Sequence, residues 1–261
     1  MSKKLLALDI DGTLTNTQKD ITPATLEKII EAQEKGHIVA IASGRPLPGI
    51  RKIADTIELD RFGGYVLAFN GGRIVDYSTG EVVYQAVLDN DVVRDIYDYC
   101  LKAGCGMVTY DGDRVITGTD IDGYMTFEAS INHMRIDNFR EYIDFPLNKC
   151  LLTADPDKAE KIEQELAEKF GDQLNIFRSE PYFVEIMPPN VHKATSLEKL
   201  LEVLDMDRKD GYNDLTMIEY AGVGVAMANA QDIVKEHADY ITLSNDEDGL
   251  VPVVDKFILA D

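Results

Sequence analysis

Acidic residues in two separated parts of the chain have a spacing that suits a divalent cation. Asp9 and Asp11, with one residue between them, directly follow the apolar run Leu5–Leu8. Asp210 and Asp214 occur together much later in the chain. Side chains two positions apart on an extended segment point the same way, so Asp9 and Asp11 can face one ligand together. Because Mg²⁺ binds carboxylate and phosphate oxygens, these residues predict chemistry on a phosphate ester.

The sequence also offers groups that could bind a phosphate. Ser43 and Gly44 follow a second apolar run at 38–42, and Lys193 stands at the start of a predicted helix. The chain has 26 Lys and Arg against 47 Asp and Glu, a formal net charge of −21, so its overall field repels an anionic substrate. The site must therefore supply its own positive charge, and Lys193 is the candidate. A cation at a helix N-terminus opposes the helix dipole, so a lysine at this position requires a reason such as a role in binding phosphate.

Each of these residues also has a purely structural interpretation. Asp11 and the two residues after it could form an ordinary turn, and Ser43 could cap a helix. Asn70, which a glycine follows, is typical of a turn after a strand, and Arg45 could form a surface ion pair instead of contacting a substrate. Lys193 could be a solvated lysine. The functional interpretation depends on the presence of all these motifs in one chain.

Alternating strands and helices are expected to position the motifs. Apolar runs at 5–8, 38–42 and 65–69 each end in a polar loop, and Thr22 followed by Pro23 predicts the start of a helix between the first two runs. This order predicts an α/β fold with a doubly wound parallel sheet, in which ligands bind at the carboxyl ends of the strands.

A second module is predicted inside the first. From about residue 73 the apolar residues alternate with polar ones, as in antiparallel strands that have one wet face. We expect an inserted α+β domain at 81–187 between the two parts of a core at 1–80 and 188–261, with Pro188-Pro189 as the return hinge. The three cysteines, an odd number without a CxxC pair, suit a reducing compartment, and the absence of a leader-like apolar segment favours the cytoplasm.

The motifs together resemble the haloacid dehalogenase superfamily, in particular its Cof-type sugar-phosphatase subgroup with a class IIB cap. The resemblance spans both ends of the chain and implies a Rossmann-like catalytic core with an inserted α+β cap that sets substrate specificity. The matching strings are DIDGTLT at 9–15, IASGRP at 41–46, NGG at 70–72, Lys193, DGYND at 210–214 and AGVGVAMANA at 221–230.

The resemblance implies a role for each matching residue. Asp9 would be the nucleophile that forms an aspartyl-phosphate, and Asp11 would be the general acid and base. Mg²⁺ would bind to Asp9, to the backbone carbonyl of Asp11 and to Asp210, while Lys193 would neutralise charge and Asp214 would orient Lys193 or metal-bound waters. The phosphate or the rest of the substrate would contact Ser43, Gly44, Arg45, Asn70, Asn190 and Asn213.

The chain departs from the family pattern just before Asp210. In relatives an apolar strand beside the nucleophile strand precedes this loop, whereas here the helix ending near Leu204 is followed by the polar segment 205–209. Either the chain has a real deletion that cripples the site, or residues are missing from the sequence at this point. The second explanation predicts a chain break or abnormal peptide geometry between Arg208 and Asp210.

These observations predict a cytoplasmic, Mg²⁺-dependent phosphatase of small phosphorylated metabolites, with sugar phosphates as the first expectation. The acidic composition makes nucleic acids and membranes unexpected partners. Two alternatives remain at this stage: a phosphomutase that uses the same aspartyl-phosphate chemistry, and a non-catalytic phosphometabolite-binding protein if the gap before Asp210 is real. The sequence does not determine the oligomeric state.

Overall fold

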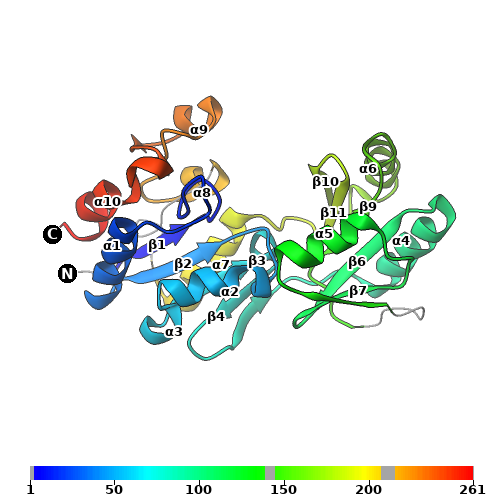
Figure 1. Ribbon diagram of the computed structural model, residues 1–261, viewed down its shortest axis with the longest axis horizontal. Helices are drawn as coiled ribbons and strands as arrows, with labels where there is room; N and C mark the ends of the chain where they lie inside the picture. Colours follow the sequence, from blue (N-terminus) through cyan, green and yellow to red (C-terminus); the bar gives the residue numbers. More distant parts are fainter. Residues whose placement is uncertain (1–2, 139–144, 207–214, 261) are drawn as a thin grey trace. The chain divides into compact units, whose positions relative to one another are not determined.

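The computed structural model describes residues 3–138, 145–206 and 215–260, and it divides the chain into two compact units (Figure 1). The first unit contains residues 1–44, 50–84 and 192–261, and the second contains 45–49 and 85–191. The second unit thus starts and ends four residues later than the predicted insert at 81–187. The reason at its start is that strand β5 (Val82–Gln85) continues the sheet of the first unit. The assignment of the two units as catalytic core and cap remains a prediction.

The first unit is built on a five-stranded sheet with the order β1-β2-β3-β4-β5. Strands β1, β2 and β3 are parallel, and β4 runs antiparallel to β3. All four residues of β1 and all five of β2 are buried, as expected for a parallel strand that is covered on both faces. The bounds are β1 (Leu5–Leu8), β2 (Ile38–Ala42), β3 (Tyr65–Ala68) and β4 (Arg73–Asp76).

Helices cover this sheet. Helix α1 (Pro23–Glu34) begins where the sequence predicts, because the Thr22 side chain accepts a hydrogen bond from the Thr25 amide and Pro23 occupies the first helical position. Helix α7 (Lys193–Leu204) packs Leu197, Leu200 and Leu201 against the face that carries Leu5 and Ala7 of β1. The other helices are α2 (Leu47–Thr56), α3 (Leu59–Phe62), α8 (Leu215–Tyr220), α9 (Asp232–Glu236) and α10 (Leu250–Val253), with η4 (Val254–Ile258) directly after α10.

The last strands of the first unit form a separate parallel pair, β12 (Val225–Ala226) with β13 (Tyr240–Ile241). Within the described residues, β1 pairs only with β2. The predicted irregularity between Arg208 and Asp210 lies outside the described residues, so the structure does not test it.

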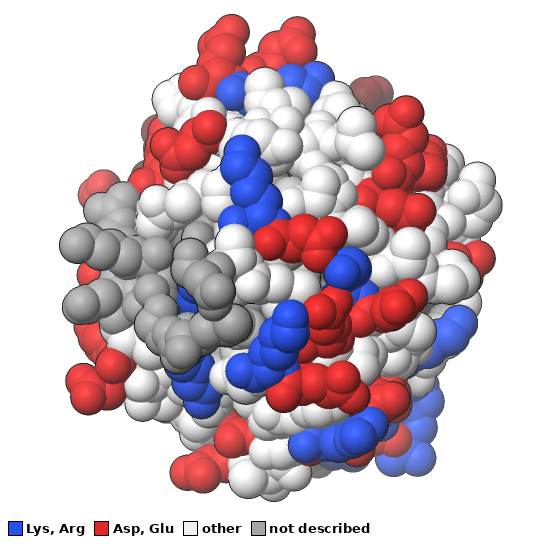
Figure 2. Space-filling model, turned by 90° about the vertical axis from the view of Figure 1, so that its left-hand side faces the viewer, with Lys and Arg blue, Asp and Glu red and all other residues white. Residues whose placement is uncertain are grey.

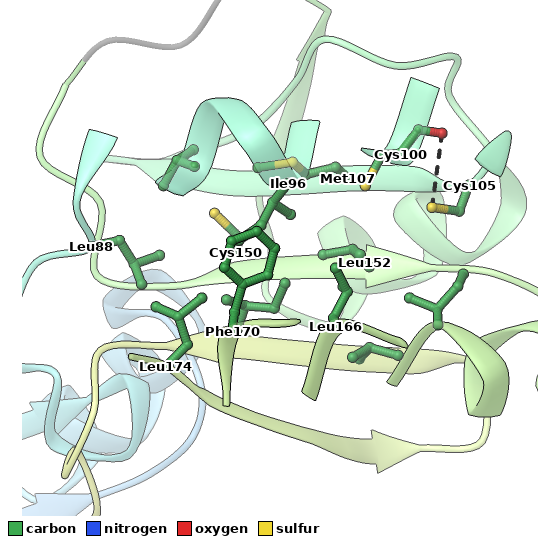
Figure 3. Packing of buried hydrophobic residues seen from close by; sticks show 14 of the residues in the cluster. Leu88, Ile96, Cys100, Cys105, Met107, Cys150, Leu152, Leu166, Phe170 and Leu174 are labelled. Carbon is green, nitrogen blue, oxygen red and sulfur yellow. Dashed lines mark hydrogen bonds between the residues drawn. The ribbon is translucent and has the colours of Figure 1, made fainter. Parts of the chain in front are cut away.

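The second unit contains a six-stranded sheet with the order β10-β11-β9-β6-β7-β8. Its strands are β6 (Gly106–Asp111), β7 (Arg114–Thr117), β8 (Arg135–Asn138), β9 (Cys150–Thr153), β10 (Asn175–Glu180) and β11 (Phe183–Met187). Helices α4 (Asn90–Ala103) and α6 (Pro156–Phe170) cover one face of the sheet, and α5 (Gly123–Ile131) covers the other. Figure 3 shows the hydrophobic core between the sheet and helices α4 and α6, in which all three cysteines are buried as free thiols.

The sequence analysis missed α5, β8 and β9. The apolar residues of α5 do not gather on one side of the helix, so the segment lacks the pattern of a surface helix. Strand β9 is only four residues long and fully buried, and such a short apolar run cannot be assigned by periodicity alone. The α/β class with an antiparallel extension after β3 is confirmed.

Candidate functional site

The predicted site residues of the first unit follow three neighbouring strands. Asp9 comes directly after β1, Ser43 directly after β2, and Asn70 two residues after β3. The register pairs Leu8 with Ile41 and Ala42 with Leu67, so the three strands end at the same edge of the sheet. Parallel pairing therefore brings together motifs that are about 30 residues apart in the sequence.

Asp9 and Lys193 form an ion pair at this edge. The Lys193 Nζ lies 2.6 Å from the Asp9 Oδ1, and the two side chains are only 16% and 17% exposed. Lys193 is the first residue of α7, and the side chain of His192 caps this helix by accepting a hydrogen bond from the Thr195 amide. A lysine at a helix N-terminus is unfavourable by itself, and the Asp9 carboxylate compensates for it. The structure thus joins two predicted catalytic residues that lie 184 positions apart.

Asp11 has a different environment. Its side chain is 41% exposed, and its Oδ1 lies 2.8 Å from the Nζ of Lys19. Lys19 has a left-handed backbone (φ 66°), and it belongs to the loop that leads from the Asp9 turn into α1. The sequence analysis did not identify Lys19, because only the path of this loop brings a lysine eight positions away back to the carboxylate.

Ser43 and Asn70 are joined through their backbones. The Ser43 amide donates to the Leu67 carbonyl at 2.9 Å, and the Asn70 amide donates to the Ser43 carbonyl at 2.9 Å. Ser43 is buried. A Cβ added at Gly44 would lie 3.1 Å from the Asn70 Oδ1, so the glycine lets the side-chain carboxamide of Asn70 approach the loop after β2. Three of the predicted phosphate contacts therefore form one packed unit.

The loop after β3 adopts a backbone that is rare for ordinary residues. Phe69, Asn70 and Gly71, which form the short helical turn η1 (Phe69–Gly71), have φ values of 55°, 53° and 90°. Left-handed conformations cost about 1–2 kcal/mol for a residue other than glycine, and such strain concentrates at functional sites. Gly71 also lies against Ser196 of α7, where an added Cβ would be 2.0 Å from the Ser196 Oγ. This contact fixes the first turn of α7, which carries Lys193.

A cavity of about 370 Å³ adjoins the two aspartates. Asp9 and Asp11 line it together with residues of β12 and of the segment that leads to α9. Two carboxylates that open into one cavity suit a hard divalent cation. In the part of the chain that the structure describes, no group of three or more His, Cys, Asp or Glu side chains could hold a metal ion. Asp210, Asn213 and Asp214 lie outside the described residues.

Two predicted substrate contacts belong to the second unit. Arg45 is partly buried in its segment 45–49, and Asn190 is exposed with a left-handed backbone (φ 60°) close to the end of the unit. The contact of Arg45 and Asn190 with a substrate remains a prediction.

Comparison with known proteins identifies the family. The family model for haloacid dehalogenase-like hydrolases matches residues 6–254. This chain is a haloacid dehalogenase-like hydrolase. The 5-amino-6-(5-phospho-D-ribitylamino)uracil phosphatase YcsE of Bacillus subtilis is 32% identical to this hydrolase over 262 residues, which cover 98% of this chain and 96% of YcsE.

Solved structures agree with this assignment. A haloacid dehalogenase-like hydrolase from Bacteroides thetaiotaomicron is 41% identical, with a TM-score of 0.91 and coverage of 98% of this chain and 99% of that one. The subclass IIB sugar phosphatase BT4131 has the same fold, with a TM-score of 0.80, 22% identity and coverage of 99% and 100%. The family resemblance predicted from the motifs is confirmed, and the hydrolase is a phosphoric monoester hydrolase. No described helix is long and apolar enough to cross a membrane.

Proposed function

We propose that this hydrolase is a Mg²⁺-dependent phosphatase of small phosphate monoesters, sugar and alditol phosphates in particular, and that Asp9 is its nucleophile. The observation that carries the proposal is the Asp9–Lys193 ion pair of 2.6 Å at the end of β1, beside a cavity that Asp11 also lines. A carboxylate held by a fixed cation at the carboxyl end of a parallel strand is oriented for attack on a phosphorus atom.

The reaction proceeds in two displacements. In the first, an oxygen of Asp9 forms a bond to phosphorus while the bond from phosphorus to the ester oxygen breaks, and Asp11 gives its proton to the departing alcohol. In the second, water attacks the phosphorus of the aspartyl-phosphate, Asp11 takes a proton from that water, and phosphate leaves as the Asp9 carboxylate is restored. Because Asp11 is partly exposed, it can exchange protons with the solvent between cycles.

Positive charge supports both steps. Phosphoryl transfer depends mainly on positioning and on stabilisation of charge at the phosphoryl oxygens. Lys193 supplies one fixed cation, and the Ser43 hydroxyl would donate to a phosphoryl oxygen. Asp9, the Asp11 backbone carbonyl and Asp210 would hold Mg²⁺, which supplies further charge neutralisation when it is bound.

The relatives support a polyhydroxylated substrate. Their names give a phosphoribitylamino-uracil and a sugar phosphate as substrates, and both compounds carry a phosphorylated carbon chain with several hydroxyl groups. The face drawn in Figure 2 offers little to a polyanion, because its described Lys and Arg side chains stand among Asp and Glu side chains. A small phosphate ester is therefore the proposed partner.

A panel of hexose, pentose and alditol phosphates tests the proposal. The purified protein is incubated with each ester and Mg²⁺, and free phosphate and sugar products are both measured. We expect phosphate release that EDTA stops and that Asp9→Asn lowers by at least about 10³-fold. Asp20→Asn is the matched control, because Asp20 is an exposed carboxylate in the same loop and should keep nearly full activity.

Three other outcomes would overturn the proposal. Interconversion of sugar phosphate isomers without free phosphate would show a phosphomutase. Binding of an ester without turnover would show a phosphometabolite-binding protein. Equal activity of Asp9→Asn and Asp20→Asn would remove Asp9 from the mechanism.

A further inference from the structure

Two asparagines near the end of the chain contact the turn that follows Asp9. The Asn229 Nδ2 donates to the Gly12 carbonyl at 2.9 Å, and its Oδ1 accepts a hydrogen bond from the Asn245 amide at 3.0 Å. The Asn245 Nδ2 in turn donates to the Thr15 carbonyl at 2.9 Å. The two carboxamides therefore connect the carbonyls at both ends of the segment from Gly12 to Thr15.

The turn has internal hydrogen bonds of its own, but they involve other groups. The Leu14 amide donates to the Asp9 carbonyl at 3.2 Å, and the Thr15 amide donates to the Ile10 carbonyl at 3.0 Å. These bonds link the end of the turn to the two residues that directly follow β1. The Gly12 carbonyl accepts a hydrogen bond from Asn229 instead, so Asn229 fixes the peptide group between Gly12 and Thr13, the second peptide group after Asp11.

The backbone approaches Asn229 closely at this point. Gly12 has a φ of 80°, and a Cβ added there would lie 3.3 Å from the Asn229 Nδ2. Asn229 also lines the same cavity as Asp9 and Asp11. A carboxamide suits this position because it donates to one backbone group and accepts from another without adding a charge beside two carboxylates. An aspartate would lose the donor and place an oxygen against the Gly12 carbonyl.

We propose that Asn229 is a positioning residue for the phosphatase reaction, which holds the turn from Gly12 to Thr15 and thereby the relative placement of the Asp9 and Asp11 carboxylates. Asn229 contacts neither the substrate nor the reacting atoms in this role. The inference rests on the proposed function, because placement of the two carboxylates matters for catalysis only if both act on the same phosphoryl group. A displacement of about 1 Å at such a site can lower a rate about 10²-fold.

The test compares Asn229→Asp and Asn229→Ala with Gln231→Glu. Gln231 lines the same cavity but has no side-chain bond to the turn, so Gln231→Glu measures the effect of an added charge alone. We expect both Asn229 variants to lower kcat about 10- to 100-fold below that of Gln231→Glu, with KM changed less than about threefold, since the phosphate contacts near Ser43 are unaffected. Because Asn229 is exposed, the melting temperature without Mg²⁺ should stay within a few degrees of the wild-type value.

A second readout does not depend on turnover. Calorimetric titration with Mg²⁺ should show weaker binding by both Asn229 variants than by the wild type and by Gln231→Glu, because the carboxylates that face the ion are no longer held. If the wild type releases no phosphate from any ester, the proposed function fails, and this titration still tests Asn229. The inference is wrong if kcat and Mg²⁺ affinity of the Asn229 variants match those of Gln231→Glu, or if the loss of activity only follows a loss of folded protein.

Discussion

Replacement of Gly71 by alanine should disturb the site from a distance. The φ of 90° at Gly71 costs an alanine about 1–2 kcal/mol. The new Cβ would also lie 2.0 Å from the Ser196 Oγ and 2.1 Å from the Ser196 Cβ, and overpacking of this kind costs about 1–3 kcal/mol. Together the two effects predict a loss of about 2–5 kcal/mol in the free energy of unfolding.

The effect on catalysis should be separable from the effect on stability. The Ser196 Oγ donates to the Lys193 carbonyl at 2.8 Å, so a shift of Ser196 moves the first turn of α7. Lys193 would then lose its 2.6 Å contact with Asp9. We expect kcat for a phosphate ester to fall about 10- to 100-fold, measured at a temperature at which the variant remains folded.

Gly80→Ala is the matched control. Gly80 has a φ of 74° in the exposed turn between β4 and β5, and no atom lies within 4 Å of a Cβ added there. The Gly80→Ala variant therefore has the conformational cost of about 1–2 kcal/mol without the steric clash, and its kcat should equal that of the wild type. The double variant Gly71→Ala with Ser196→Gly should recover most of the activity, because it removes both clashing atoms. Equal urea midpoints and equal kcat values for Gly71→Ala and Gly80→Ala would refute the reasoning.

Further predictions concern stability and thiol reactivity. Removal of one partner of the buried ion pair between Lys149 and Glu185, by Glu185→Gln, should cost about 3–5 kcal/mol in urea unfolding, whereas Lys149→Met with Glu185→Leu should be much less costly. Lys28 donates a hydrogen bond to the Glu31 carboxylate, which lowers the pKa of Glu31 from 4.5 to about 2. The stabilisation of the fold by ionised Glu31 is therefore fully present above pH 4.5 and is lost as the pH falls toward 2. Unfolding free energies measured across this range should therefore decline less steeply for Glu31→Gln than for the wild type, and identical slopes would contradict this. Burial raises the pKa of Cys150 to about 12, so maleimide at pH 8 should label it only after unfolding; rapid labelling of the native protein would show that the thiol is accessible.

The sequence by itself predicted the strands and the first helix that position the site residues, and it indicated the chemistry of the candidate site. The apolar runs of β1 and β2 gave the parallel strands, because strands buried on both faces must be apolar at every position. Thr22 and Pro23 marked the start of α1 by local hydrogen bonding and a fixed backbone angle. The spacing of Asp9 and Asp11 and the position of Lys193 at a helix start pointed to phosphoryl chemistry, since these signals depend only on residue type and local spacing.

Only the tertiary structure decided how the site is held. Lys19 reaches Asp11 because the intervening loop folds back. Gly71 packs against Ser196 because the end of β3 and the start of α7 meet there. Asn229 binds the Gly12 carbonyl across 217 positions of sequence. None of these contacts has a local signature: a lysine in a polar loop, a glycine after an asparagine and an asparagine in an acidic chain each fit many structures. Their function arises from which backbone groups the sheet places beside them, and that depends on packing of the whole first unit.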